Sequence, residues 1–225
     1  GVVSGAILPM QRAFGLVQWQ EEVILSSTVL AAMCSSFVSG TFNHRYGRRT
    51  CSLLAAAVFA AGSFILLVAW TFEILVLGRI VVGVGIGIAS LTTPIYIAEV
   101  AAPNLRGRLV TINAFLVTFG QFVAGMVDGV FDTLMPDTGW RMMLGLAAVP
   151  GLIMYFGFLK LPESPRWLAQ KGRLEEAELV LKAYREADDE AAEEMAEIQQ
   201  SIQEHSSNTN EQHNGSPEET LEEHD

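Results

Sequence analysis

The chain has 225 residues, half of them hydrophobic, and a formal net charge of −11. Residues from 163 onward hold 18 acidic and 5 basic side chains, whereas residues 1–162 hold 7 acidic and 9 basic ones. This split excludes a single soluble acidic domain and predicts an apolar, membrane-embedded block followed by a solvated acidic segment. The two cysteines, Cys34 and Cys51, give neither a disulfide framework nor a metal-binding spacing.

The first 162 residues contain six apolar segments separated by short polar loops. A membrane-spanning helix needs ~20 mainly apolar residues. The first segment, Gly1–Phe14, is shorter, and we interpret it as the end of a truncated span. The other predicted spans are Val23–Phe42, Cys51–Trp70, Ile74–Ile97, Leu109–Phe131 and Met142–Leu161. The sequence therefore predicts an all-α membrane protein with a six-helix bundle over residues 1–162.

Basic side chains gather in alternate connections. They lie between the second and third spans, between the fourth and fifth, and after the sixth, while the opposite connections carry acidic residues. The positive-inside rule then places the basic connections and the C-terminal tail in the cytoplasm. Within the spans, small residues recur four apart at Gly83/Gly87, Gly120/Ala124 and Gly125/Gly129, a spacing typical of closely packed membrane helices.

Residues 163–204 predict a cytoplasmic helical segment. Leu174, Ala177, Leu181 and Tyr184 fall at helical spacing with charges between them, and a weaker repeat follows from Met195. We expect two short amphipathic helices here. Residues 205–225 are polar and acidic with almost no hydrophobic side chains, which predicts a disordered tail.

Three polar side chains fall at membrane depth, where such groups are costly and are functional candidates. Arg79 lies early in the fourth span, either extending to the membrane interface or forming a buried cation that needs a carboxylate. Gln121 and Asp128 lie seven residues apart on one face of the fifth span. They predict either a polar stripe that hydrogen-bonds a polyol or contacts between helices.

Charged residues also gather at the predicted cytoplasmic ends of the spans. Arginines alone would satisfy the positive-inside rule, but this rule does not require the acids Glu99 and Glu163. Their presence predicts a network of ion pairs between helix ends that opens and closes. The predicted members are Arg45, Arg48, Arg49, Glu99, Arg106, Glu163 and Arg166. No nucleophile–base pair, carboxylate pair or metal-ligand spacing accompanies them, so we expect no enzyme activity and no cofactor.

Within the sugar porter family of the major facilitator superfamily, the chain looks most like the proton-coupled myo-inositol cotransporters, at G-V-V-S-G-A (1–6), I-G-I-A-S (86–90), L-V-T-I-N (109–113), V-D-G (127–129) and M-L-G-L-A-A-V-P (143–150). The resemblance to the family itself rests on six further motifs. They are R-Y-G-R-R at 45–49, G-R at 78–79, P-x-Y-x-x-E at 94–99, L-R-G-R at 105–108, F-G-Q at 119–121 and P-E-S-P-R-W at 162–167. The resemblance implies the N-terminal half of a two-half bundle. It also implies that Gln121 binds substrate hydroxyls and that the charged network stabilises the outward-facing state. Arg79 would pair with an aspartate of the first span, two residues before the position of Gly1.

The expected function is therefore transport of a polyol or sugar, as proton-coupled myo-inositol symport by alternating access. A facilitative hexose uniporter is one alternative. A truncated, non-transporting membrane protein that acts as a sensor or binds a partner is another. The expected partners are the substrate, protons, the lipid bilayer and a missing C-terminal six-helix half, without nucleic acid. The expected location is the plasma membrane, with several spans and a cytoplasmic tail.

Overall fold

The structure, a computed structural model, describes residues 17–134, 139–185 and 188–214. Every regular element in these ranges is an α-helix. The chain divides into two compact units, Gly1–Ser164 and Pro165–Asp225. Glu163 therefore belongs to the first unit, although the composition predicts a boundary just before it.

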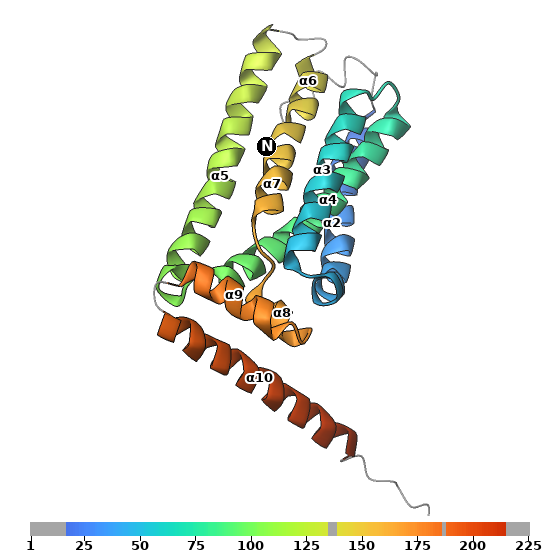
Figure 1. The fold of residues 1–225 in the computed structure, drawn as a ribbon. Helices are drawn as coiled ribbons and strands as arrows, with labels where there is room; N and C mark the ends of the chain where they lie inside the picture. Colours follow the sequence, from blue (N-terminus) through green and yellow to red (C-terminus); the bar gives the residue numbers. More distant parts are fainter. Residues whose placement is uncertain (1–16, 135–138, 186–187, 215–225) are drawn as a thin grey trace, which may run out of the picture. The chain divides into compact units, whose positions relative to one another are not determined.

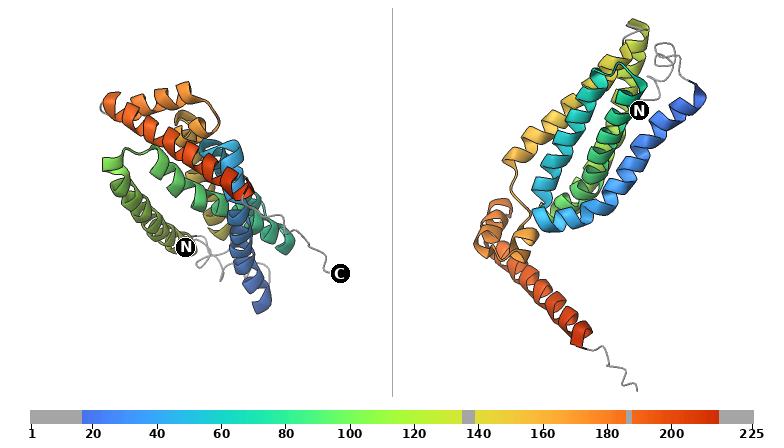
Figure 2. Two further views of the ribbon diagram at one scale, coloured as in Figure 1. Left: turned by 90° about the horizontal axis from the view of Figure 1, so that it is seen from below. Right: turned by 90° about the vertical axis from the view of Figure 1, so that its right-hand side faces the viewer.

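The first unit is a bundle whose helices run alongside one another (Figures 1 and 2). Five segments of the described chain are long and apolar enough to cross a membrane. They correspond to the second to sixth predicted spans, and the first, Gly1–Phe14, lies outside the described residues. The helices are α2 (Gln18–Tyr46), α3 (Arg48–Leu67), α4 (Phe72–Val100), α5 (Pro103–Leu134), α6 (Gly139–Leu146) and α7 (Ala148–Lys160).

The last predicted span is two helices rather than one. α6 ends at Leu146 and α7 begins at Ala148. Pro150 has no amide hydrogen, and a proline ring inside a helix clashes with the carbonyl four residues earlier, here that of Leu146. The proline therefore explains why the span is interrupted near Ala147.

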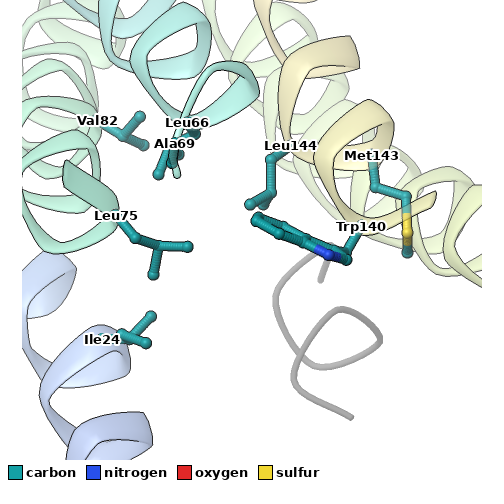
Figure 3. Close-up of a cluster of buried hydrophobic side chains, with 8 residues drawn as sticks. All are labelled: Ile24, Leu66, Ala69, Leu75, Val82, Trp140, Met143 and Leu144. Carbon is teal, nitrogen blue, oxygen red and sulfur yellow. The ribbon is translucent and has the colours of Figure 1, made fainter. Parts of the chain in front are cut away.

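Close contact between α2, α3 and α4 forms the centre of the bundle. A Cβ added at Gly83 would meet the carbonyl oxygen of Thr28, and one at Gly87 would meet the carbonyl oxygen of Ala32. These two glycines therefore let α4 lie directly against the α2 backbone, as their spacing predicts. Nearer one end, side chains from α2, α3, α4 and α6 and from Ala69 form one buried cluster, in which Trp140 is 1% exposed and lies beside Leu144 (Figure 3).

α5 is the least covered helix of the bundle. It packs mainly against α6 and α4, and no residue of its most apolar stretch is buried within the chain. A Cβ at Gly120, Gly125 or Gly129 would meet nothing within 4 Å. The prediction that these small residues pack against another helix is therefore not met by the residues that the structure describes.

The second unit contains α8 (Pro165–Gln170), α9 (Leu174–Tyr184) and α10 (Asp188–Asn214). Trp167, Leu168, Ala177, Leu181 and Met195 belong to its buried core. α9 agrees with the predicted amphipathic helix, but α10 is longer than expected. α10 runs on to Asn214 and so overlaps the start of the predicted disordered tail, and the disorder of residues 205–225 stays a prediction. Residues 215–225 lie outside the described residues.

Candidate functional site

The candidate site begins at the turn between α2 and α3. Gly47 joins the two helices with a φ of 93°, a conformation that a residue with a side chain rarely adopts. A Cβ there would also collide with the carboxylate of Glu163. Glycine therefore allows both the turn and the close approach of this carboxylate.

Glu163 caps the start of α3. Its Oε1 accepts hydrogen bonds from the backbone N–H groups of Arg48 at 2.8 Å, Arg49 at 2.9 Å and Ser164 at 3.0 Å. The first N–H groups of a helix have no partner within the helix and carry a partial positive charge, so they attract a carboxylate. Glu163 thus attaches the chain that follows α7 to the beginning of α3.

Arg48 and Glu99 form a two-pronged ion pair between α3 and α4. Arg48 Nη2 donates to Glu99 Oε1 at 2.9 Å, and Nε lies 2.8 Å from Oε2 as a contact between charges without hydrogen-bond geometry. The two side chains are only 11% and 12% exposed. This matters for the energy, because removing one partner of a buried pair costs about 3–5 kcal/mol, whereas exposed pairs contribute about 0–1 kcal/mol.

Ser164 and Arg49 extend this arrangement to the end of α7. The hydroxyl of Ser164 donates to Glu99 Oε2 at 2.5 Å. Arg49 donates from Nε to the carbonyl of Phe158 at 3.1 Å and from Nη2 to that of Leu159 at 2.8 Å. These are carbonyls at the C-terminal end of α7, where a cation is favourable. Four of the seven predicted network residues therefore meet: Arg48, Arg49, Glu99 and Glu163.

Two further residues, Ser164 and Tyr96, make polar contacts at this end and were not predicted as members of the network. Ser164 donates to Glu99, and the hydroxyl of Tyr96 donates to the carbonyl of Pro162 at 2.8 Å. Both residues lie inside the motifs P-x-Y-x-x-E and P-E-S-P-R-W. A three-residue spacing places Tyr96 and Glu99 on one face of α4, which is the signal that could have identified the tyrosine.

The other three predicted members are not brought to this pair. Arg45 is exposed and its guanidinium lies 5.7 Å from the Tyr46 ring centroid. Arg106 is exposed as well. Within the described part of the chain, neither forms an ion pair with Glu99 or Glu163. Arg166 lies in the second unit, and its part in the network stays a prediction.

The three polar residues at membrane depth lie apart from this network along the chain. Arg79 on α4 is 4% exposed, and its Nε and Nη2 have no hydrogen-bond partner among the described residues. Its guanidinium is thus buried rather than extended to the interface. On α5, Gln121 is exposed whereas Asp128 is 5% exposed. The structure therefore does not present these two side chains as one uniform polar stripe.

Sequence comparison places the chain among known transporters. A family model for sugar (and other) transporters matches residues 10–221. The proton myo-inositol cotransporter of Homo sapiens is 56% identical over 185 residues, which are 82% of this chain and 28% of that protein. The arabinose-proton symporter of Escherichia coli (strain K12) is 36% identical over 202 residues, which are 90% of this chain and 42% of that protein.

Structural comparison agrees with this placement. The xylose transporter XylE from E. coli, in a partially occluded inward-open conformation, has a TM-score of 0.82 at 26% identity. The alignment covers 90% of this chain and 55% of that one, so the chain spans only part of each of these proteins. The fold is that of a major facilitator sugar transporter, a multi-pass membrane protein. The chain therefore belongs to the sugar (and other) transporter family.

Proposed function

We propose that this chain is the N-terminal half of a polyol or sugar transporter that carries myo-inositol together with protons by alternating access. The observation that carries the proposal is the buried Arg48–Glu99 pair, with Ser164 and Glu163 beside it. These residues join the ends of α3, α4 and α7 through side chains. Such contacts can be broken without unfolding any helix, so they suit a gate between two facing states.

The proposed orientation follows from the charged connections. The arginine-rich turn after α2 and the arginines at the start of α5 face the cytoplasm by the positive-inside rule. The network then lies at the cytoplasmic end, and its closed form stabilises the outward-facing state. The second unit and the acidic tail lie in the cytoplasm, and the protein resides in the plasma membrane.

Arg79 is the proposed proton-coupling residue. A buried guanidinium requires a carboxylate partner to offset its lost hydration, and no described residue supplies one to Nε or Nη2. We place this partner on the first span, as the family resemblance implies. Protonating that carboxylate would release Arg79 and change the relative energies of the two facing states.

Gln121 and Asp128 are the proposed substrate-binding residues. An exposed amide on a membrane-spanning helix is costly next to lipid but favourable next to a water-filled cavity. The exposure of Gln121 therefore supports a position facing the substrate path, between this bundle and the proposed C-terminal half. Asp128 would hydrogen-bond substrate from farther along the same helix.

The experiment measures uptake of labelled myo-inositol by the longer protein, meaning the proposed transporter with both halves, in liposomes with an imposed pH gradient. We expect accumulation when the outside is acidic. Arg79→Gln should abolish accumulation but leave exchange of labelled for unlabelled substrate, and Gln121→Ala should raise the half-saturating concentration. Uptake that ignores pH and membrane potential would favour the facilitative uniporter. Absence of uptake of any polyol or sugar would contradict transport itself.

A further inference from the structure

A buried polar chain joins α2 to α4 next to the charged network. Thr92 Oγ1 donates to Asn43 Oδ1 at 3.0 Å, and it lies 3.4 Å from Ser39 Oγ. Thr92 is 0% exposed, Ser39 is 2% exposed and Asn43 is 3% exposed. Nothing in the function proposed above uses these three side chains.

Asn43 touches both this chain and the ion pair. While its side chain accepts from Thr92, its backbone carbonyl accepts from Arg48 Nη1 at 3.2 Å. The same carbonyl accepts the N–H of Gly47 at 3.1 Å. One residue therefore connects the α2–α4 contact with the guanidinium that binds Glu99.

On α4, the three side chains that bind neighbouring segments here lie in one row. Thr92, Tyr96 and Glu99 are spaced by four and three residues, which places them on one helix face. Thr92 contacts α2, Tyr96 contacts Pro162, and Glu99 contacts α3. A shift of α4 along α2 that broke the Asn43–Thr92 bond would therefore also move Glu99 relative to Arg48.

The energetics of the Asn43–Thr92 pair indicate a role in aligning the two helices rather than in stabilising the fold. Asn43 Nδ2 is buried without a hydrogen-bond partner among the described residues, and an unpaired buried donor is unfavourable. An apolar pair of similar shape would be neutral or stabilising for folding. A polar pair allows only one alignment of two helices, as buried polar residues do in other helix pairs.

We propose that Asn43 is a positioning residue of the gate. Through Thr92 it fixes the alignment of α2 on α4 at which Arg48 and Glu99 meet with both prongs. The inference rests on the proposed role of the Arg48–Glu99 pair. It assigns to the gate a second contact, two helical turns farther into the span than Glu99.

The test compares variants of the longer transporter by hydrogen exchange at residues 43–50 and by uptake kinetics. Asn43→Leu combined with Thr92→Val removes both polar groups at nearly constant volume, so the protein should fold normally. We expect exchange at the α2–α3 turn to rise about two- to tenfold, because a misaligned Arg48–Glu99 contact would weaken by about the value of one hydrogen bond. The turnover rate should change while the half-saturating substrate concentration does not.

Three further variants make the test specific. Thr92→Ser alone keeps the hydroxyl, so its exchange rate should equal that of the unmodified protein. Ser36→Ala on the same helix should change nothing, since among the described residues this half-buried hydroxyl donates within α2, to the carbonyl of Met33. In a Glu99→Gln background, the Asn43→Leu/Thr92→Val change should add little, because both act on one contact.

The outcomes separate the inference from the proposed gate. If Glu99→Gln raises exchange and Asn43→Leu/Thr92→Val does not, the positioning role is wrong and the gate stands. Fully additive effects of the two changes would likewise overturn the positioning role. If Glu99→Gln itself leaves exchange and turnover unchanged, the gate is wrong and the inference falls with it.

Discussion

Gly47 is the residue on which the geometry of the charged network depends. Its φ is 93°, and a Cβ there would meet the Glu163 carboxylate that caps α3. Gly47→Ala should therefore lower the free energy of unfolding by about 1–3 kcal/mol through backbone strain. It should lower it further because Glu163 must move away. The measurement is the thermal unfolding midpoint of the purified protein in detergent.

Gly172 provides the matched control for this prediction. Its φ is 76°, but a Cβ there would meet nothing within 4 Å. Gly172→Ala should therefore show the strain without the collision, and lower the midpoint less. Equal losses in the two variants would mean that contact with Glu163 adds nothing to the role of Gly47.

Sequence reasoning identified the residue types of the network better than its membership. Glu99 and Glu163 were identifiable because the positive-inside rule does not call for acids. Arg45 and Arg106 looked equivalent to Arg48 in the sequence. Which arginine reaches a carboxylate depends on where α2 ends and α3 begins, and helix ends are poorly fixed by hydropathy.

The helices themselves show where hydropathy succeeds and where it fails. A long apolar run predicts a span because the backbone must satisfy its own hydrogen bonds in lipid, and the second to sixth spans appear as helical segments. Hydropathy carried no sign of the interruption at Ala147, which depends on Pro150. Nor could it show that the α4 glycines meet another helix and the α5 glycines do not.

This contrast between α4 and α5 gives a prediction for two glycines. A Cβ at Gly87 would meet the Ala32 carbonyl oxygen and Ser35 Oγ on α2, whereas one at Gly125 would meet nothing. Gly87→Ala should separate α4 from α2 and cost about 1–3 kcal/mol. In the 225-residue chain, Gly125→Ala should gain up to about 1 kcal/mol from helix propensity. Chemical unfolding in detergent measures both, and a loss at Gly125 would contradict the exposed position of this face.

At the scale of the whole molecule, α5 and α7 present different kinds of exposed surface. On α5, the small residues Gly120 and Gly125 flank the polar Gln121. On α7, Gly157 is flanked by Ile153 and Phe156, two large apolar side chains that are exposed. Small and polar residues suit contact with another membrane helix, whereas large apolar side chains suit lipid. We therefore expect the proposed C-terminal half to cover α5 and leave this part of α7 in the bilayer.

Gly125→Leu and Gly157→Leu test this arrangement, because neither position has an atom within 4 Å of an added Cβ in this chain. The 225-residue chain is co-expressed with the remainder of the longer protein, and the two pieces are purified through a tag on one of them. Gly125→Leu should reduce recovery of the partner piece, since a Leu side chain would hold α5 away from the facing helix. Gly157→Leu should leave recovery unchanged, since lipid adapts to the added volume. Equal recovery for both variants would contradict α5 as the covered face, and a loss confined to Gly157→Leu would place the second half against α7 instead.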